Sequence, residues 1–145
     1  MPIPFTAREM QKAWRDNKSA ADKNPRTNAH RLLLFYAVEC GLKAILMKRQ
    51  SKNCTDECEE IWQAKHNINK LLDCLATGAY LRLPSQLIMK PIRRNKSQNE
   101  QRKLTPGEIN QMWRYGGCST EINDEEVEKK LAQIADWIEG ELKRP

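Results

Sequence analysis

Cysteine and histidine residues in the middle of the chain have the ligand types of a structural zinc site. Cys54, Cys58, His66 and Cys74 follow the spacing Cys-x3-Cys-x7-His-x7-Cys. Thiolates and imidazoles are the usual ligands of structural zinc, but this spacing is not one of the common zinc patterns. Cys74 also fits an apolar position of a helix. We therefore expect reduced thiols at these positions, with no bound metal and no cofactor.

The remaining chemical signatures are weak. The chain has five cysteines, whereas a secreted disulfide scaffold usually has an even and dense set. The glycines of "RYGGCS" lack the Lys-Ser/Thr that follows in a phosphate-binding loop. No basic start with an apolar stretch marks a signal peptide, and the longest apolar run, Leu32 to Val38, is too short to span a membrane. We expect a cytoplasmic protein without membrane contact, and whether it is an enzyme stays open.

A charged pair interrupts the most apolar stretch, "HRLLLFYAVECGLKAILMKR". Glu39 and Lys43 are four residues apart with the acid first, the favoured order on a helix. On an exposed strip this pair would add a few tenths of a kcal/mol. Removed from water, the same pair would be costly unless it is fully hydrogen-bonded. The sequence leaves both interpretations open.

The net charge of +6 is unevenly distributed. Residues 79–104 carry seven cations against one acid, Glu100, whereas residues 105–145 carry five cations against nine acids. The seven are Arg82, Lys90, Arg93, Arg94, Lys96, Arg102 and Lys103. Such a segment could follow a nucleic-acid backbone. It could also be a solvated loop or a loop that binds a partner protein.

The elements that must position these residues are predicted to be helices in one domain, residues 1–145. Capping boxes at Thr6 and Thr105 and acidic starts mark the helix beginnings. The predicted helices span about 6–20, 27–49, 55–63, 66–78, 105–116 and 123–142. Prolines and the basic run predict irregular structure at 79–104. We thus expect an all-α, up-and-down bundle of four long helices plus one or two short ones.

A stripe of small residues runs along the central predicted helix. Ala37, Gly41 and Ala44 are spaced i, i+4, i+7. A glycine inside a helix costs roughly 1 kcal/mol against alanine, so close packing is the expected reason for Gly41. The partner of this stripe is either another helix of the chain or a second copy in a homodimer.

Three parts of the sequence carry a resemblance to a known family: "YAVECGLKAILMKR", "KHNINKLLDCL", and "MWRYGG" together with "NDEEVEKKLAQIADWI". The first part is similar to the second helix of HEPN domains, and the second part to the entry of the next HEPN helix. The third part resembles the Arg-Tyr segment and the last helix of that family. The order is that of the family over roughly residues 25–142. The resemblance implies a helical bundle that often dimerises, and cleft-edge polar residues at Glu39, Lys43, His66, Arg114 and Tyr115.

The RNA-cleaving members of the family carry Arg, four to six residues, then His, and this chain departs from that pattern. The positions before His30 hold Lys23, Asn24 and Pro25, and Arg26 is one residue too close. No histidine follows Arg114 at the required spacing. Without a histidine so placed, acid–base catalysis near neutral pH lacks its usual group.

The leading hypothesis is a non-catalytic or weakly catalytic HEPN-like domain that binds RNA or an RNA-containing complex, in prokaryotic antiviral defence or toxin–antitoxin conflict. A second hypothesis is a protein–protein interaction module, either an antitoxin-like or accessory subunit or a homodimer. A third is a metal-independent ribonuclease that uses His66, with Arg114 or Lys43 brought close by the fold.

Overall fold

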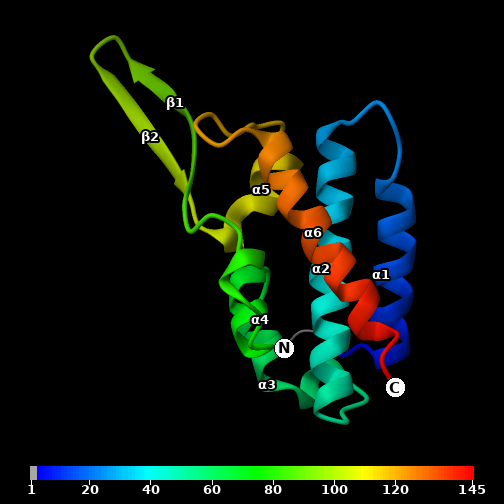
Figure 1. Ribbon diagram of the computed structural model, residues 1–145. Helices are drawn as coiled ribbons and strands as arrows, with labels where there is room; N and C mark the ends of the chain where they lie inside the picture. Colours follow the sequence, from blue (N-terminus) through cyan, green and yellow to red (C-terminus); the bar gives the residue numbers. More distant parts are fainter. Residues whose placement is uncertain (1–2) are drawn as a thin grey trace.

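Three long helices form the body of the protein. The computed structural model describes residues 3–145, and in it α1 (Ala7–Ala21), α2 (Asn28–Arg49) and α6 (Asp124–Leu142) lie side by side (Figure 1). α2 is the central helix, because it contacts α1, α4, α5 and α6. Their bounds agree closely with the helices predicted at 6–20, 27–49 and 123–142.

Local side-chain hydrogen bonds fix where these helices begin. The Thr6 hydroxyl accepts the Glu9 N–H at 3.1 Å, and the Glu9 carboxylate accepts the Thr6 N–H at 3.0 Å. This capping box satisfies two donors that the first turn of α1 would otherwise leave free. Asn123 caps α6 by accepting the Glu126 N–H at 2.9 Å. Both predicted helix starts are therefore confirmed.

The small-residue stripe of α2 packs inside the chain. Ala37 and Ala44 are buried, and a Cβ added to Gly41 would lie 2.7 Å from Ile138 Cγ2 and 3.0 Å from Trp14 Cε3. Gly41 thus lets α1 and α6 approach α2 from two sides. The stripe does not supply a homodimer face, because its neighbours belong to the same chain.

The helices between α2 and α6 are shorter than predicted. α3 (Glu59–Ala64), α4 (Ile68–Cys74) and α5 (Ile109–Arg114) have six or seven residues each. Three 3-10 turns accompany them: η1 (Thr55–Glu57), η2 (Ala79–Leu81) and η3 (Pro106–Glu108). The prediction of four long helices is wrong for the described chain, which has three.

The helix predicted at 66–78 is shorter because its end was misplaced. α4 ends four residues before Gly78, the last residue of the predicted helix, and Ala76 takes a positive φ of 55°, the conformation that a glycine usually supplies at a helix end. Its apolar positions Ile68, Leu71 and Leu72 are nevertheless buried, as the helical spacing predicts.

A β hairpin replaces the irregular segment predicted at 79–104. β1 (Leu87–Asn95) and β2 (Gln98–Leu104) pair antiparallel and project from the helical body (Figure 1). The protein is therefore mostly helical but not all-α. The prolines of this segment favoured irregular structure, yet Pro91 lies between the paired residues Met89 and Ile92, at an irregularity in the register where no ladder N–H is needed.

The hairpin is anchored only at its base. Leu87 and Met89 are buried, and the Thr120 N–H donates to the Ile88 carbonyl at 2.9 Å. Beyond Ile92 nearly every residue is exposed on both faces, so the apolar–polar alternation that signals a half-buried strand is missing. No helix among residues 3–145 is long and apolar enough to cross a membrane.

Candidate functional site

A pocket of about 790 Å³ opens beside α2, between α1 and the segment that contains η1 and α3. Its apolar wall comes from residues distant in sequence. These are Ile3, Phe5, Met10, Ala13, Ile61 and Trp62. Its polar wall includes Glu39, Lys43, Lys65 and His66. A pocket of this size, mostly apolar with a few converging polar groups, is typical of small-molecule sites.

Glu39 is the centre of the polar wall. Its residue is only 7 % exposed, and its two carboxylate oxygens accept from different partners. Oε2 accepts from Lys43 Nζ at 2.7 Å, and Oε1 lies 3.0 Å from His66 Nδ1. The Glu39–Lys43 pair is therefore a desolvated pair rather than an exposed helix pair, and hydrogen bonds compensate its desolvation.

These contacts shift the pKa values of Glu39 and His66. Burial alone would raise the pKa of Glu39, but the bonds to His66 and Lys43 outweigh it and hold that pKa below its usual value. The hydrogen bond to Glu39 raises the pKa of His66, against a smaller opposing effect of burial. Because a carboxylate only accepts, Nδ1 carries a proton and Nε2 is left for other partners.

The turn before His66 directs that side chain to Glu39. Lys65 ends α3 with a φ of 54° and a ψ of −114°, a conformation that residues with a side chain rarely adopt. Such backbone costs on the order of 1–3 kcal/mol and concentrates at functional sites. His66 does not cap α4, because Asn67 does so by accepting the Lys70 N–H at 3.2 Å.

Arg114 and Tyr115, the other predicted cleft-edge residues, lie outside the hydrogen-bonded cluster of Glu39, Lys43 and His66. The Arg114 guanidinium donates to the Tyr36 hydroxyl and lies 5.8 Å from the Tyr36 ring centroid. Its charge is near enough to oppose protonation of His66. Arg114 makes no hydrogen bond to His66 among the described residues, and Tyr115 is 75 % exposed. Glu39, Lys43 and His66 therefore form the cluster, with Arg114 beside it.

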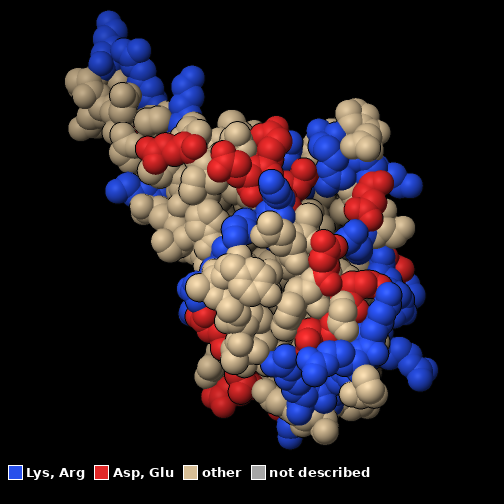
Figure 2. Space-filling model, in the orientation of Figure 1, with Lys and Arg blue, Asp and Glu red and all other residues tan. Residues whose placement is uncertain are grey.

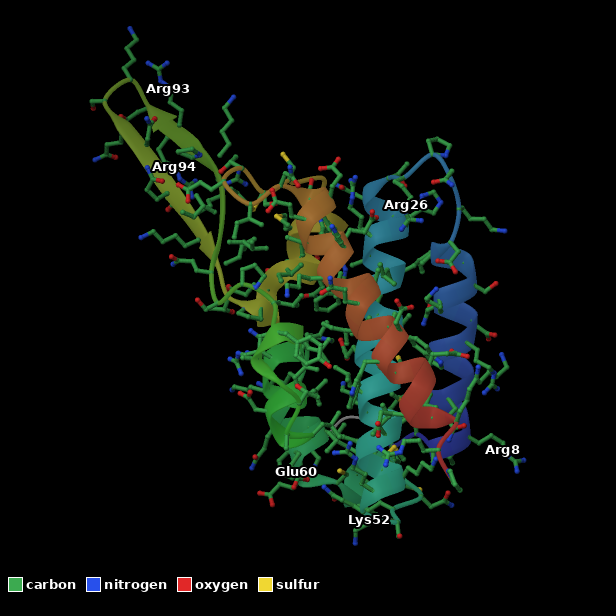
Figure 3. All side chains as sticks on the ribbon, viewed as in Figure 1. Arg8, Arg26, Lys52, Glu60, Arg93 and Arg94 are labelled. Carbon is green, nitrogen blue, oxygen red and sulfur yellow. The ribbon has the colours of Figure 1, made fainter. Side chains whose placement is uncertain are left out.

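The second histidine and its nearest arginine have structural roles. His30 Nδ1 accepts the Thr27 N–H at 3.2 Å at the start of α2. Arg26 donates to the Glu128 carboxylate at 3.0 Å and to the Ala21 carbonyl, close to its label in Figure 3. Both side chains are occupied by helix ends, so this pair does not form a reactive centre.

The cysteines and the histidine that have zinc-ligand chemistry in the sequence do not converge. Among residues 3–145, one group of His, Cys, Asp or Glu brings three potential ligand atoms within 4.8 Å of one another, and it consists of Cys54, Asp56 and Glu57. His66 instead faces Glu39. Burial raises the pKa of Cys58 to about 11, so that sulfur is held as a thiol.

Six of the seven predicted nucleic-acid-binding cations lie on the hairpin. Lys90, Arg93, Arg94, Lys96 and Lys103 are exposed, and Arg102 is half-buried where it donates to the Lys90 carbonyl at 2.8 Å. Figure 2 shows Lys and Arg side chains gathered at the projecting end, and Figure 3 shows Arg93 and Arg94 on it, away from the helices. The seventh, Arg82, lies before the hairpin and pairs with Asp73.

Most of these charges lack a carboxylate partner. Glu100 pairs with Arg94 at 2.7 Å. The other five hairpin cations form no ion pair within the described part of the chain, and Arg93 only approaches carbonyls of its own turn at 3.4 Å. The hairpin is therefore a projecting, strongly cationic ribbon.

Comparison with known proteins gives no assignment: no family model matches the chain, and neither a curated protein nor a solved structure is found to be similar.

Sequence reasoning missed the apolar wall of the pocket. Ile3 and Phe5 precede the first helix, and Trp62 stands among charged residues in "EEIWQAK". Trp62 is 48 % exposed and Phe5 46 %. The available signal was a tryptophan next to Ile61 on a six-residue helix that begins with two glutamates. Its meaning depends on the N-terminal segment crossing over to it, which local spacing does not reveal.

Proposed function

We propose that this protein is a non-catalytic or weakly catalytic, HEPN-like domain that binds RNA through its cationic hairpin. The observation that carries the proposal is the projecting ribbon at residues 87–104, with six Lys/Arg residues against one acid. Contacts of lysine and arginine to phosphate supply most of the affinity of sequence-independent nucleic-acid binding.

The geometry of the ribbon favours a long, charged partner. Its cations extend away from the helices, so a flexible backbone can approach from several sides (Figure 3). Their charge is little neutralised by the chain itself, because Glu100 is the one acid on the ribbon. Displacement of counterions from RNA by unpaired cations is favourable, whereas cations already paired would first have to give up their partners.

The choice of an HEPN-like RNA-binding domain also rests on motif order. The three resembling segments fall in α2, at the start of α4, and in α5 with α6. The hairpin lies between the second and third, so it is an insertion relative to a purely helical plan. A place in antiviral defence or toxin–antitoxin conflict remains part of this proposal.

Fluorescence anisotropy with a labelled single-stranded RNA tests the proposal. Wild-type protein at low salt should bind, and the triple variant Arg93→Ala, Arg94→Ala, Lys96→Ala should bind on the order of tenfold more weakly. Absence of binding to both RNA and DNA at low salt would contradict the proposal.

A matched control removes three cations elsewhere. Arg8, Lys52 and Lys129 are exposed and form no side-chain hydrogen bond or ion pair among the described residues. Arg8 and Lys52 are labelled on the body in Figure 3. Alanine at these three positions changes the net charge equally. An equal loss of affinity in this control would mean that overall charge, not the hairpin, determines binding.

Weak ribonuclease activity is a second candidate, favoured by the Glu39–His66 contact. Glu39 holds His66 Nδ1 and leaves Nε2 for proton transfer, the arrangement that a general base requires. His66→Ala should abolish any metal-independent cleavage, while His30→Ala, at the helix start, should retain it. Cleavage that survives His66→Ala would remove this candidate.

A homodimer or partner-protein module stays a prediction, which light scattering and pull-down would check.

A further inference from the structure

The pocket beside α2 has an uneven hydrogen-bonding capacity. Both oxygens of Glu39 are occupied, one by Lys43 and one by His66. An ammonium has three donors, and Lys43 uses one on Glu39 with no other partner among residues 3–145. Its side chain is 13 % exposed, so a ligand must enter the pocket to reach the remaining donors. Donors, not acceptors, are thus the unused polar groups of the buried wall.

The apolar side chains of the pocket are left exposed to solvent. Ile3, Phe5 and Trp62 are three of the five large hydrophobic residues that the described chain leaves exposed, and all three line this pocket. Their clustering on one concave surface is a mark of a binding site. The volume of about 790 Å³ lies within the usual range for small-molecule ligands.

Charged groups are also distributed unequally around the pocket. Glu9 and Asp56 belong to segments joined by the Thr55 N–H, which donates to the Phe5 carbonyl at 2.8 Å. The Glu9 carboxylate is already engaged in the capping box of α1. Lys43 and His66 both contact Glu39, and Lys65, which precedes His66 at the end of α3, also lines the pocket. An anion therefore finds free donors and positive charge next to the Glu39 cluster.

We infer that this pocket binds a small amphipathic carboxylate, whose anionic head contacts Lys43 and His66 and whose apolar body packs against Phe5 and Trp62. Charge complementarity selects the head, because a carboxylate supplies acceptors for the unused donors of Lys43. Burial of Phe5, Trp62 and the alkyl body supplies the remaining affinity. This inference goes beyond the hairpin proposal and is independent of it.

Calorimetric titration with three probes of equal chain length tests the inference in wild-type protein. Decanoate should bind most tightly, decanol roughly tenfold more weakly and decyltrimethylammonium weakest, since a charge-assisted hydrogen bond distinguishes the first two. Decanoate and decyltrimethylammonium are used below their micelle-forming concentrations, and decanol is used below its solubility limit. Equal affinity for decanoate and decanol, tighter binding of the cation, or no binding of any probe would overturn the inference.

Two variants separate the head site from the apolar site. Lys43→Met removes the ammonium but keeps an unbranched side chain only one atom shorter, and it should remove the preference for decanoate over decanol. Lys70→Met, on the exposed face of α4, should preserve that preference. Ala13→Phe fills the pocket and should weaken decanoate and decanol alike. Preference for decanoate that survives Lys43→Met, or protein dimerisation that buries Trp62 and excludes the probes, would also overturn it. Failure of these tests leaves RNA binding by the hairpin unaffected.

Discussion

The pocket wall and the hairpin use the same side-chain chemistry in opposite ways. At the pocket, Lys43 is held against Glu39 with side chains that are 13 % and 9 % exposed. On the hairpin, Lys96 and Arg93 extend into solvent without a carboxylate partner within residues 3–145. A cation in the first environment determines local structure and protonation, whereas one in the second is free for a partner. Charge counts along the sequence do not separate these two uses.

The largest expected effect comes from breaking the buried cluster. Glu39→Ala leaves Lys43 and His66 without their shared acceptor, and an unpaired buried charge costs about 3 kcal/mol of unfolding free energy. Urea denaturation followed by circular dichroism measures this loss. The triple hairpin variant should change stability by less than about 0.5 kcal/mol, because its side chains are exposed. A comparable loss in both proteins would abolish the distinction between the two regions.

The packing of α2, the helix that carries Glu39 and Lys43, should be nearly as sensitive to substitution. Gly41→Ala places a methyl group 2.7 Å from Ile138 Cγ2, and overpacking of this kind costs about 1–3 kcal/mol. Gly140→Ala is the matched control, because a Cβ there has no neighbour within 4 Å. It should stabilise α6 by about 0.5–1 kcal/mol. An equal loss of stability in both variants would contradict the explanation by close packing at Gly41.

The pH dependence of stability should follow from the same cluster. Because the pKa of Glu39 is lowered in the folded protein, Glu39 stabilises the fold at pH values above 4.5, its ordinary pKa. This contribution is lost as the pH falls through the folded pKa. Because the pKa of His66 is raised in the folded protein, His66 stabilises the fold at pH values below 6.5, its ordinary pKa. This contribution is lost as the pH rises through the folded pKa. The combined stabilisation should therefore be greatest between about pH 4.5 and 6.5.

Glu39→Gln tests how the charge of Glu39 affects the pKa of His66, and its expected effect is smaller than that of the substitutions above. The amide removes the negative charge that favours protonated His66, so the pKa of His66 should fall toward or below its ordinary value. An NMR titration of the imidazole resonances measures it, and the urea midpoint should then vary less between pH 6 and 8. An unchanged His66 pKa in this variant would contradict the role assigned to Glu39.

The sequence predicted what depends on local rules. Thr6, Asn123 and Thr105 begin their helices as the capping patterns require, and α2 extends over the apolar stretch. The hairpin was missed because its outer half is exposed on both faces and because Pro91 lies where no ladder bond is needed. The end of α4 was missed because Ala76, not Gly78, adopts the positive φ.

The candidate site was only partly accessible to sequence reasoning. Glu39, Lys43 and His66 were singled out, but their mutual contacts depend on the turn at Lys65 that brings α4 back toward α2. The apolar wall depends on long-range pairing, since Phe5 and Thr55 are fifty residues apart. Neither the pairing nor the pocket leaves a periodic signal in the sequence.

The salt dependence of RNA binding tests the central claim most directly. For wild-type protein, the logarithm of the association constant should fall linearly with the logarithm of salt concentration. Replacement of Arg93, Arg94 and Lys96 by alanine should reduce the magnitude of that slope by about 2, since each lost phosphate contact on a single strand contributes about 0.7. Alanine at Arg8, Lys52 and Lys129 should leave the slope unchanged. An unaltered slope in the hairpin variant would contradict RNA binding by this ribbon.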